Sequence, residues 1–447
     1  MTSLTNSLEA ARRGLASDAG VVVGVMIFQN ALRIISSIIL TRILNVEAFA
    51  VVGIVTSVMV TFGLISDIGI VAFMVRHERS LDNDFRNQVW TLRLIRGCAL
   101  SITIALLSGY IADYMQKPYL HWAIAISGLF AVIDGLGSMA PFTALRNRRV
   151  RMLSAIDVST QLINTIVTIL LALVFKSYWS MIISILIGQI TGAIFSYILY
   201  PDSSQKFNFS RERAAELWKF SRFITGSTIL TLVITQGDKL VLSRIFPLST
   251  MGLYVMAAGL AAVPISLVSS YASRVLYPQY AEVYRETPDL LQGKFYGLRM
   301  NLSLMYAFAV GGFIGCGPLV IEILYDPRYE NSGYYLQVLL ISTFFVAGNS
   351  AANDIMITIG KTSYTLYSNI VRIVYLSISA WLGWKYYGAV GVIWAVGTVE
   401  VAGQLYAWMQ LYKYKFLRVS QEFYILITGL AGLLVGYGVN ITAKMLF

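Results

Sequence analysis

Long apolar segments that are nearly free of charge recur along the whole sequence. Residues 178–200 and 423–443 contain no charged residue at all, and about 20 apolar residues are enough for a helix to cross a bilayer. Of the 447 residues, 57% are apolar and only 13% are charged, which is roughly half the charge of an ordinary soluble domain. The sequence therefore excludes a soluble protein and predicts a polytopic membrane protein.

The apolar segments are long enough for helices, in which every backbone group is satisfied internally. The alternation in segments of about 10 residues that marks a transmembrane β-barrel is absent. We predict an all-α fold with about 12–14 transmembrane helices. Thirteen spans are placed at residues 19–40, 48–72, 89–112, 119–142, 152–175, 178–200, 217–243, 252–276, 298–324, 334–359, 363–386, 388–412 and 421–446.

The positive charges predict the orientation of these spans. The first 18 residues are polar, and the apolar run that follows them is too long for the core of a signal peptide. If the N-terminus is cytoplasmic, 20 of the 34 Lys and Arg residues fall in cytoplasmic segments and 7 on the opposite side. Because cytoplasmic loops carry the excess of Lys and Arg, we expect a cytoplasmic N-terminus and interpret the net charge of +11 as a topology signal, not as a sign of nucleic-acid binding.

Two connecting stretches resemble each other at an offset of 202 residues. Residues 41–52 read TRILNVEAFAVV and residues 243–254 read SRIFPLSTMGLY. Six spans separate them, so the repeat would be parallel, as in many transporters, although any two apolar hairpins share some likeness. We expect a cytoplasmic segment at 1–18, an N-lobe at 19–200 (spans 1–6), a cytoplasmic loop at 201–216, a C-lobe at 217–412 (spans 7–12) and an additional C-terminal span at 413–447.

A family resemblance rests on these same two stretches. LTRILNVEAFAVVGIVTSVMVTFGLISDIGI, from residue 40, resembles the first hairpin of Wzx-type polysaccharide-transport flippases, which belong to the superfamily that includes MATE exporters. Asn45 and Ala50 replace the glycine pair that is usual in that hairpin. QGDKLVLSRIFPLSTMGLYVMAAGLAAVP, from residue 236, is similar to the seventh and eighth helices of that family. The matching residues are Arg42, Glu47, Phe49, Ser66, Asp67 and Gly69 in the first stretch, and Asp238, Arg244, Gly252, Tyr254, Ala257 and Pro264 in the second.

The resemblance implies a flippase of the bacterial inner membrane with two six-helix lobes in a MATE-like arrangement. Its substrate would be an oligosaccharide repeat unit on undecaprenyl pyrophosphate, moved to the periplasmic leaflet by alternating access for exopolysaccharide, O-antigen or capsule synthesis. Membrane lipids and a polysaccharide polymerase or co-polymerase would be its partners, and an ion gradient would drive it. A MATE-type drug or cation antiporter and a lipid II flippase remain alternatives.

A membrane enzyme such as a polysaccharide polymerase or ligase is a further alternative. The predicted outside loops are short, and the sequence has no glycine-rich phosphate loop, no Ser/His/Asp set and no paired-carboxylate motif. Its two Cys and two His residues lack metal-ligand spacing. We therefore expect no enzyme activity, no cofactor and no metal site, and no nucleic-acid partner.

Cationic side chains inside or next to the spans are the candidates for binding a pyrophosphate, because the guanidinium fork suits phosphate. Arg33 lies in the middle of span 1 with Gln29 one turn before it, and Arg372 lies in the middle of span 11. The alternative is that Arg33 and Arg372 pair with buried acids such as Asp134 and Glu400. Four further candidates lie near span ends and have snorkelling to lipid phosphates as their alternative: Arg93, Arg96, Arg222 and Arg274.

Acidic and amide side chains in the spans complete the expected site. Asp134 and Glu400 are candidates for ion coupling, with a structural ion pair as the alternative. Asp67 is expected to pair with Arg76 or Arg79, as a gate. Asp238 and Lys239 are adjacent and point about 100° apart on a helix. Asn349 and Asn353 share a helix face and would line a polar cavity, with hydrogen bonding between helices as their alternative.

Overall fold

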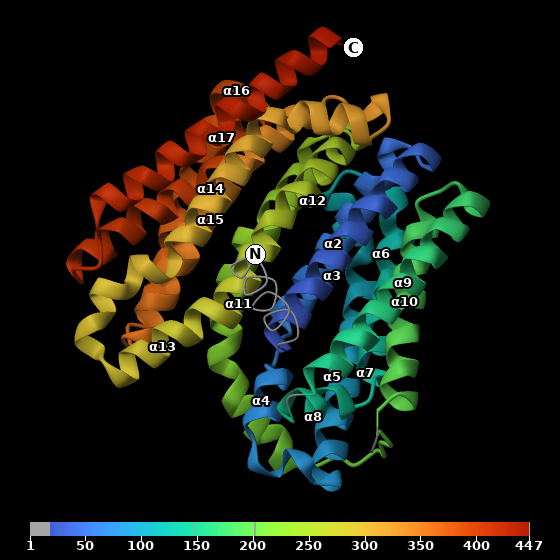
Figure 1. Cartoon of the computed structure of the whole chain (residues 1–447). Coiled ribbons are helices and arrows are strands. Elements are labelled where there is room, and N and C mark those ends of the chain that lie inside the picture. Colours follow the sequence, from blue (N-terminus) through green and yellow to red (C-terminus); the bar gives the residue numbers. More distant parts are fainter. Residues whose placement is uncertain (1–17, 148, 201–202, 447) are drawn as a thin grey trace, which may run out of the picture. The chain divides into compact units, whose positions relative to one another are not determined.

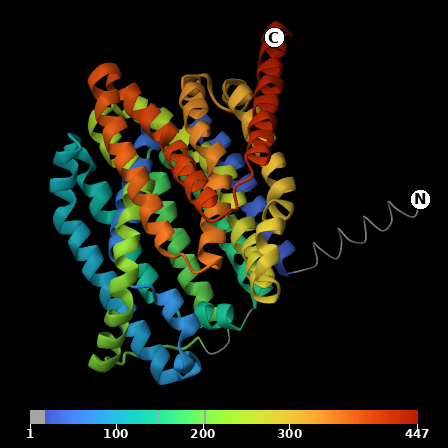
Figure 2. The same ribbon diagram turned by 90° about the vertical axis from the view of Figure 1, so that its left-hand side faces the viewer.

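The structure is a computed structural model that describes residues 18–147, 149–200 and 203–446 (Figure 1). All regular elements in these ranges are helical, and the view from the side also shows only coiled ribbons (Figure 2). By length and composition, 11 of the described helices can cross a membrane. The predicted all-α membrane fold is confirmed.

The chain divides into two compact units between Leu248 and Ser249. In the first unit α3 packs against α11, α5 against α7, and α9 against both α2 and α10. Its helices are α2 (Asp18–Ile43), α3 (Val46–Ile65), α4 (Ile70–Arg76), η1 (Glu78–Leu81), α5 (Asn83–Tyr114), η2 (Pro118–Leu120), α6 (His121–Ser127), α7 (Leu129–Leu136), α8 (Ala140–Arg146), α9 (Val150–Phe175), α10 (Trp179–Ile198) and α11 (Arg211–Ile245).

In the second unit α14 packs along both α15 and α17, and α15 packs along α16 (Figure 1). Its helices are α12 (Leu248–Tyr271), η3 (Ala272–Leu276), α13 (Tyr277–Glu286), η4 (Pro288–Leu290), α14 (Leu291–Leu324), η5 (Pro327–Tyr329), α15 (Ser332–Thr358), α16 (Ser363–Lys413) and α17 (Val419–Leu446).

The two similar connecting stretches have the same helix boundaries. α2 ends at Ile43 and α3 begins at Val46, while α11 ends at Ile245 and α12 begins at Leu248, so both boundaries keep the offset of 202 residues. The buried positions repeat as well: Leu40, Thr41, Leu44 and Phe49 correspond to the buried residues Leu242, Ser243, Phe246 and Met251. The local part of the expected repeat is therefore present, and the lobe boundaries at 19–200 and 217–412 stay a prediction.

α16 is a helical hairpin. Its 51 residues would span roughly 77 Å as one straight helix, more than twice the ~30 Å hydrocarbon core. Gly388 interrupts it with φ 60° and ψ −142°, and the two arms run back along each other. A Cβ at Gly383 would lie 2.5 Å from the Gly391 carbonyl oxygen, and the Tyr375 hydroxyl bonds Thr398 Oγ1 at 2.9 Å. The sequence places two spans here, at 363–386 and 388–412.

The expected span at 217–243 lies inside α11, which is not one of the 11 helices that are apolar enough to cross a membrane. The total of thirteen spans therefore stays a prediction. The expected C-terminal span corresponds to α17, which packs closely on α14. A Cβ at Gly311 would lie 2.1 Å from the Gly429 carbonyl oxygen, and one at Gly436 would lie 2.1 Å from that of Gly312. Small residues let membrane helices approach in this way.

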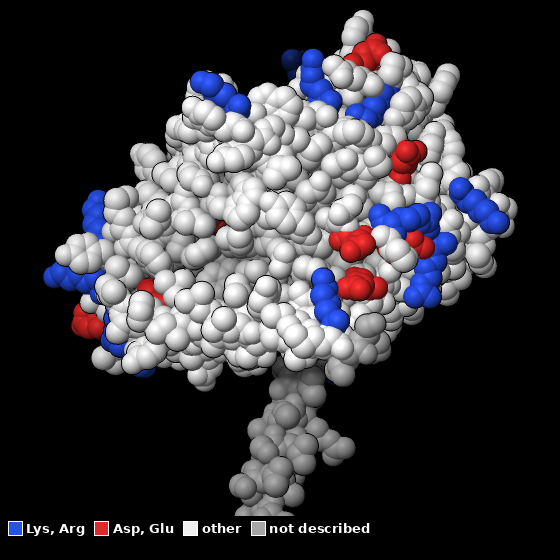
Figure 3. All heavy atoms as spheres, turned by 90° about the horizontal axis from the view of Figure 1, so that it is seen from above, with Lys and Arg blue, Asp and Glu red and all other residues white. Residues whose placement is uncertain are grey.

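Charged side chains are sparse on the surface. In the face seen from above, most atoms are white and the charged groups form a few small clusters (Figure 3). Many large apolar side chains are exposed, among them Leu106, Val174 and Met305, which are 72%, 76% and 73% exposed. Exposed apolar surface of this extent fits contact with lipid.

Gly388→Ala is expected to destabilise the second unit. A residue with a Cβ is strained at this φ and ψ, at a cost of about 1–3 kcal/mol, so the thermal unfolding midpoint of the detergent-solubilised protein should fall. Gly259→Ala is the matched control, because Gly259 lies inside α12 with nothing within 4 Å of its added Cβ. Equal midpoints for the two variants would contradict the hairpin turn.

Candidate functional site

Arg93 is neutralised inside the first unit. Its guanidinium forms an ion pair with Asp134 at 2.8 Å, and its side chain is 11% exposed. The same guanidinium lies 5.1 Å from the centre of the Phe142 ring. The pair joins α5 to α7, so the interpretation of Asp134 as a structural ion-pair partner is supported, with Arg93 in place of Arg33.

Arg96, one turn further along α5, bonds neutral groups. Its Nη2 donates to Ser66 Oγ at 2.9 Å and to the Gly63 carbonyl at 3.1 Å. These acceptors belong to the last turn of α3 and its C-terminal cap. Arg93 and Arg96 therefore do not form a matched pair of phosphate receptors, since each is already held by protein groups.

Arg33 has no ion-pair partner among the described residues. It is exposed on α2, and within the described residues no carboxylate lies at ion-pair distance from it. Asp134, its expected alternative partner, is bonded to Arg93. Gln29 lies one turn before Arg33 and is half-buried. An exposed guanidinium in the middle of an apolar helix is costly and is free to receive an anion.

Arg372 pairs with Glu400 at 3.0 Å across the two arms of α16. Asn349 of α15, which is 3% exposed, donates to the same carboxylate. The absence of a side chain at Gly403 makes room for this cluster, because a Cβ there would lie 2.5 Å from Arg372 Nε. The ion-pair alternative therefore holds for Arg372 and Glu400.

Asn353 also bonds between helices, since its Oδ1 accepts from Thr365 Oγ1 at 2.6 Å. Asn349 and Asn353 thus connect α15 to α16. These contacts are the hydrogen bonds between helices that were the alternative to a polar cavity. Their partners lie 12 and 51 residues away in the chain, which spacing on one helix does not reveal.

A buried cluster in the second unit was not anticipated from the sequence. Arg299 on α14 and Glu422 on α17 form an ion pair and are 1% and 7% exposed. The Glu422 carboxylate also accepts from the Tyr296 hydroxyl at 2.7 Å and from Trp408 Nε1 at 3.1 Å. The sequence places Arg299 at the start of the span 298–324 without marking it as a site residue. The aromatic pair FY just before it was the available signal, because both rings lie 4.6–4.7 Å from its guanidinium.

Asp67 does not pair with Arg79, one of its two expected partners. Its carboxylate accepts from the backbone N–H of Gly69 at 2.8 Å, a local turn in which Gly69 has φ 62°. Arg79 pairs with Asp82 at 2.9 Å instead. That hydrogen bond, helped by one from the Asp84 N–H, holds the pKa of the exposed Asp82 carboxyl below its usual range. The Arg76 side chain lies outside the described residues.

The remaining expected site residues are scattered. Lys239 donates to Gln236 at 3.4 Å, and Gln236 also accepts from Ser57 of α3 at 3.0 Å. Asp238 next to it is half-buried. Arg274 is exposed within the π-helical turn η3. The Arg222 side chain on α11 lies outside the described residues.

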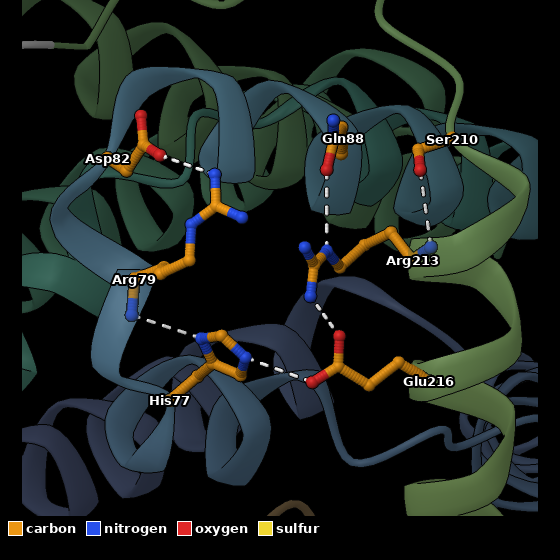
Figure 4. A network of polar contacts seen from close by, with 7 residues as sticks. All are labelled: His77, Arg79, Asp82, Gln88, Ser210, Arg213 and Glu216. Atoms are coloured by element: carbon orange, nitrogen blue, oxygen red, sulfur yellow. Dashed lines mark hydrogen bonds and ion pairs between the residues drawn. The ribbon is translucent and has the colours of Figure 1, made fainter.

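A polar network joins the start of α11 to the segment between α4 and α5 (Figure 4). Glu216 bonds His77 at 3.0 Å and pairs with Arg213. Arg213 also reaches Gln88 at 3.3 Å and lies 4.7 Å over the Phe85 ring. The network therefore fixes the first turns of α11 on α5 within the first unit.

An aromatic pocket of about 550 Å³ lies beside the hairpin turn of α16. Trp394 Nε1 donates to the Tyr334 hydroxyl at 2.8 Å, and the Tyr375–Thr398 bond forms another part of its wall. None of the described residues that line this pocket is charged. Aromatic faces with hydroxyl groups beside them suit the apolar faces and hydroxyls of sugar rings.

Comparison with known proteins gives consistent matches. A family model described as "Polysaccharide biosynthesis protein" matches residues 39–333. The chain is 20% identical over 428 residues to the "Lipopolysaccharide biosynthesis protein WzxC" of Escherichia coli, covering 92% of this chain and 85% of that protein. It is 21% identical over 388 residues to the "Succinoglycan biosynthesis transport protein ExoT" of Rhizobium meliloti, covering 85% and 76%.

Solved structures show the same fold. "Lipid II flippase MurJ, inward closed conformation" matches with a TM-score of 0.72 and 15% identity, covering 94% of this chain and 92% of that one. An inward-facing MATE family transporter of the MOP superfamily matches with a TM-score of 0.65 and 14% identity, covering 89% and 99%. The chain is thus a multi-pass membrane protein with a MATE-like fold.

Glu422→Ala is expected to lower the thermal midpoint strongly, because it leaves Arg299 charged and unpaired in a buried site, at a cost of about 3–5 kcal/mol. The double variant Arg299→Met with Glu422→Ala should recover part of the loss, since it removes the orphaned charge. Unfolding in detergent, followed by tryptophan fluorescence, measures both. A double variant that is less stable than Glu422→Ala would argue against the ion pair as the source.

Proposed function

The chain belongs to the family of polysaccharide biosynthesis proteins, and from this premise we propose that it is a flippase for a lipid-linked oligosaccharide in the bacterial inner membrane. The observation that carries the proposal is the family match, which covers residues 39–333 and so includes helices of both units. Relatives named for lipopolysaccharide synthesis and for succinoglycan transport support it. The proposed activity is transport without covalent chemistry.

We further propose that the carrier lipid is undecaprenyl pyrophosphate and that Arg33 binds its diphosphate during passage. A diphosphate cannot enter hydrocarbon without a compensating cation, and a guanidinium offers it two parallel hydrogen bonds. Arg33 is exposed and free of ion pairs in the described part of the chain. Arg93 and Arg372 are weaker candidates than Arg33 for binding the diphosphate, because the substrate would have to displace Asp134 and Glu400 from them.

The orientation and cycle follow as proposals from the charge distribution. With the N-terminus in the cytoplasm, the hairpin turn at Gly388 and the aromatic pocket beside it face the periplasm. Alternating access of two lobes, 19–200 and 217–412, then releases the oligosaccharide on the side where the pocket can contact its sugar rings. Asp134 and Glu400 remain the proposed carriers of a coupling ion, and a polysaccharide polymerase is the proposed partner that takes the product.

The leaflet location of the substrate tests the function directly. In a deletion strain, lipid-linked repeat units are expected to accumulate and to stay hidden from a membrane-impermeant sugar probe, because flipping has failed. A complementing copy of the gene is the control. Repeat units that reach the periplasmic leaflet unpolymerised would contradict a flippase and favour an enzyme that acts after flipping.

Arg33→Ala is expected to cut export in the complemented strain by about tenfold or more, the value of one hydrogen-bonded contact to a charged group. Membrane levels should stay normal, since the described structure gives Arg33 no ion pair to lose. Arg42→Ala is the matched control, because Arg42 is also an exposed arginine of α2 but lies in its last turn. Export that survives Arg33→Ala unchanged would remove Arg33 from the path.

Trp394→Ala is expected to slow export about two- to tenfold, the size of a lost aromatic contact, while Trp394→Phe retains most of it. Trp384→Ala is the control: Trp384 is on the same helix and 48% exposed, but does not line the pocket. Equal effects of the two alanine variants would indicate that tryptophan in this region serves the membrane interface and not sugars.

A further inference from the structure

We propose that the first unit has a separate binding site for a diphosphate, in a basic pocket formed where η1, the start of α5, α8 and the start of α9 meet. The inference rests on the proposed flippase function for the identity of its ligand. The pocket lies among loop segments and is distinct from Arg33 in the span. Its lining residues include Arg86, Thr143, Asn147, Arg149 and Tyr200.

Arg86 is a buried cation with unused hydrogen-bonding capacity. It is 6% exposed, and its Nη2 donates to the Asn83 side chain. Its Nε is buried and has no hydrogen-bond partner, and no carboxylate within the described ranges forms an ion pair with it. Buried charges are normally paired, so an arginine in this state can donate hydrogen bonds to an anion.

Two described acids lie near the pocket without forming an ion pair with its arginines: Asp157, whose charge acts on Tyr200, and Asp82, whose charge acts on Arg86 from a distance. Asp82, which precedes α5, uses its carboxylate on Arg79 at 2.9 Å and on the Asp84 N–H at 3.1 Å. Among the described residues, no Asp or Glu lines the pocket. The positive charge of Arg86 and Arg149 is therefore left to attract an anion from solution or from a lipid head group.

Arg149 is placed to close around such an anion. It is exposed and lies directly before the first residue of α9, whose N-terminus has no side-chain cap. The partial positive charge of that helix end adds to its field. The neighbouring Arg146 is already used, since its guanidinium donates to the His77 carbonyl and to Ser80 Oγ and holds α8 against η1.

The opposite wall is rigid and neutral. Tyr200 is 6% exposed and packs on Ala140 and Ala144 of α8. Burial, together with the negative charge of Asp157, raises the pKa of Tyr200 to about 12, so its hydroxyl stays protonated and can only help an anion by donating. Asn147 adds an amide at the end of α8.

The size of the pocket limits what it can hold. Its volume is about 260 Å³, which is below the ~300–1,000 Å³ of sites that enclose drug-sized ligands. It suits a phosphate or diphosphate group and leaves an attached lipid and oligosaccharide outside. The diphosphate of the proposed substrate combines this size with negative charge.

The first experiment measures binding of inorganic pyrophosphate to the full-length protein by calorimetry in phosphate-free detergent. Arg149→Ala and Arg86→Gln are expected to weaken saturable binding by about tenfold or more each, and added salt should weaken it further. Arg211→Ala is the matched control, an exposed arginine at the start of α11 that does not line the pocket. Arg149 is exposed, so its variant tests the site even if Arg86→Gln fails to fold.

Absence of binding, or equal binding by wild type, Arg149→Ala and Arg211→Ala, would overturn the site. The source of the phosphate is tested by repeating the titration in nanodiscs. Pyrophosphate binding that persists in phosphatidylcholine and in phosphatidylglycerol discs supports a substrate diphosphate. Pyrophosphate binding that is seen in phosphatidylcholine discs but lost in phosphatidylglycerol discs would show that anionic lipid head groups occupy the pocket, and would overturn that assignment.

Export in the deletion strain separates this inference from the proposed function. If flipping fails without the protein and Arg149→Ala also slows export about tenfold or more, both stand. If the deletion blocks flipping but Arg149→Ala exports normally, the pocket is not used by the substrate and the flippase remains. If the deletion leaves flipping intact while Arg149 still governs pyrophosphate binding, the function is wrong and the anion site stands.

Discussion

The free energy of placing a charge in hydrocarbon decides how the helices of this protein are arranged. An ionisable side chain inside a membrane helix is costly, by at least about 2.5–3.5 kcal/mol at the helix centre, and a partner of opposite charge on another helical segment lowers this cost. Arg93 with Asp134, Arg372 with Glu400 and Arg299 with Glu422 meet this need. Each pair links two helical segments of one unit, and so the charges fix which segments pack together.

Glycine makes these pairings geometrically possible. The backbones of α14 and α17 touch at Gly311 and Gly429, and the arms of α16 touch at Gly383 and Gly391. Gly403 leaves the space that Arg372 occupies beside Glu400. In lipid the packing of helices has little hydrophobic driving force, so close backbone contact and polar pairing together take over the role that an apolar core has in water.

Much of the fold follows from the sequence, and less of the site does. Apolar length predicts the helices, and the separate spans at 363–386 and 388–412 match the two arms of α16, because length in lipid is a property of one segment. The choice of an ion-pair partner depends on two segments that can lie far apart in the chain, as with Glu422, which is 123 residues from Arg299. The sequence places Lys117 in an outer loop, but its side chain is buried, with 7% exposed. It donates a hydrogen bond at 3.2 Å to the carbonyl of Phe246, which lies at a helix end far along the chain. Burial lowers the pKa of its ammonium group.

The described arginines fall into two classes with different consequences for an anionic substrate. For Arg93, Arg299 and Arg372, binding a phosphate means breaking an ion pair, and the carboxylate released must then find a proton or a new partner. Arg33, Arg86 and Arg149 have no such competitor among the described residues, and all three belong to the first unit. A paired arginine is available to the substrate only when its acid takes up a proton or finds a new partner, which is the physical reason to propose Glu400 for ion coupling and Arg33 for substrate binding.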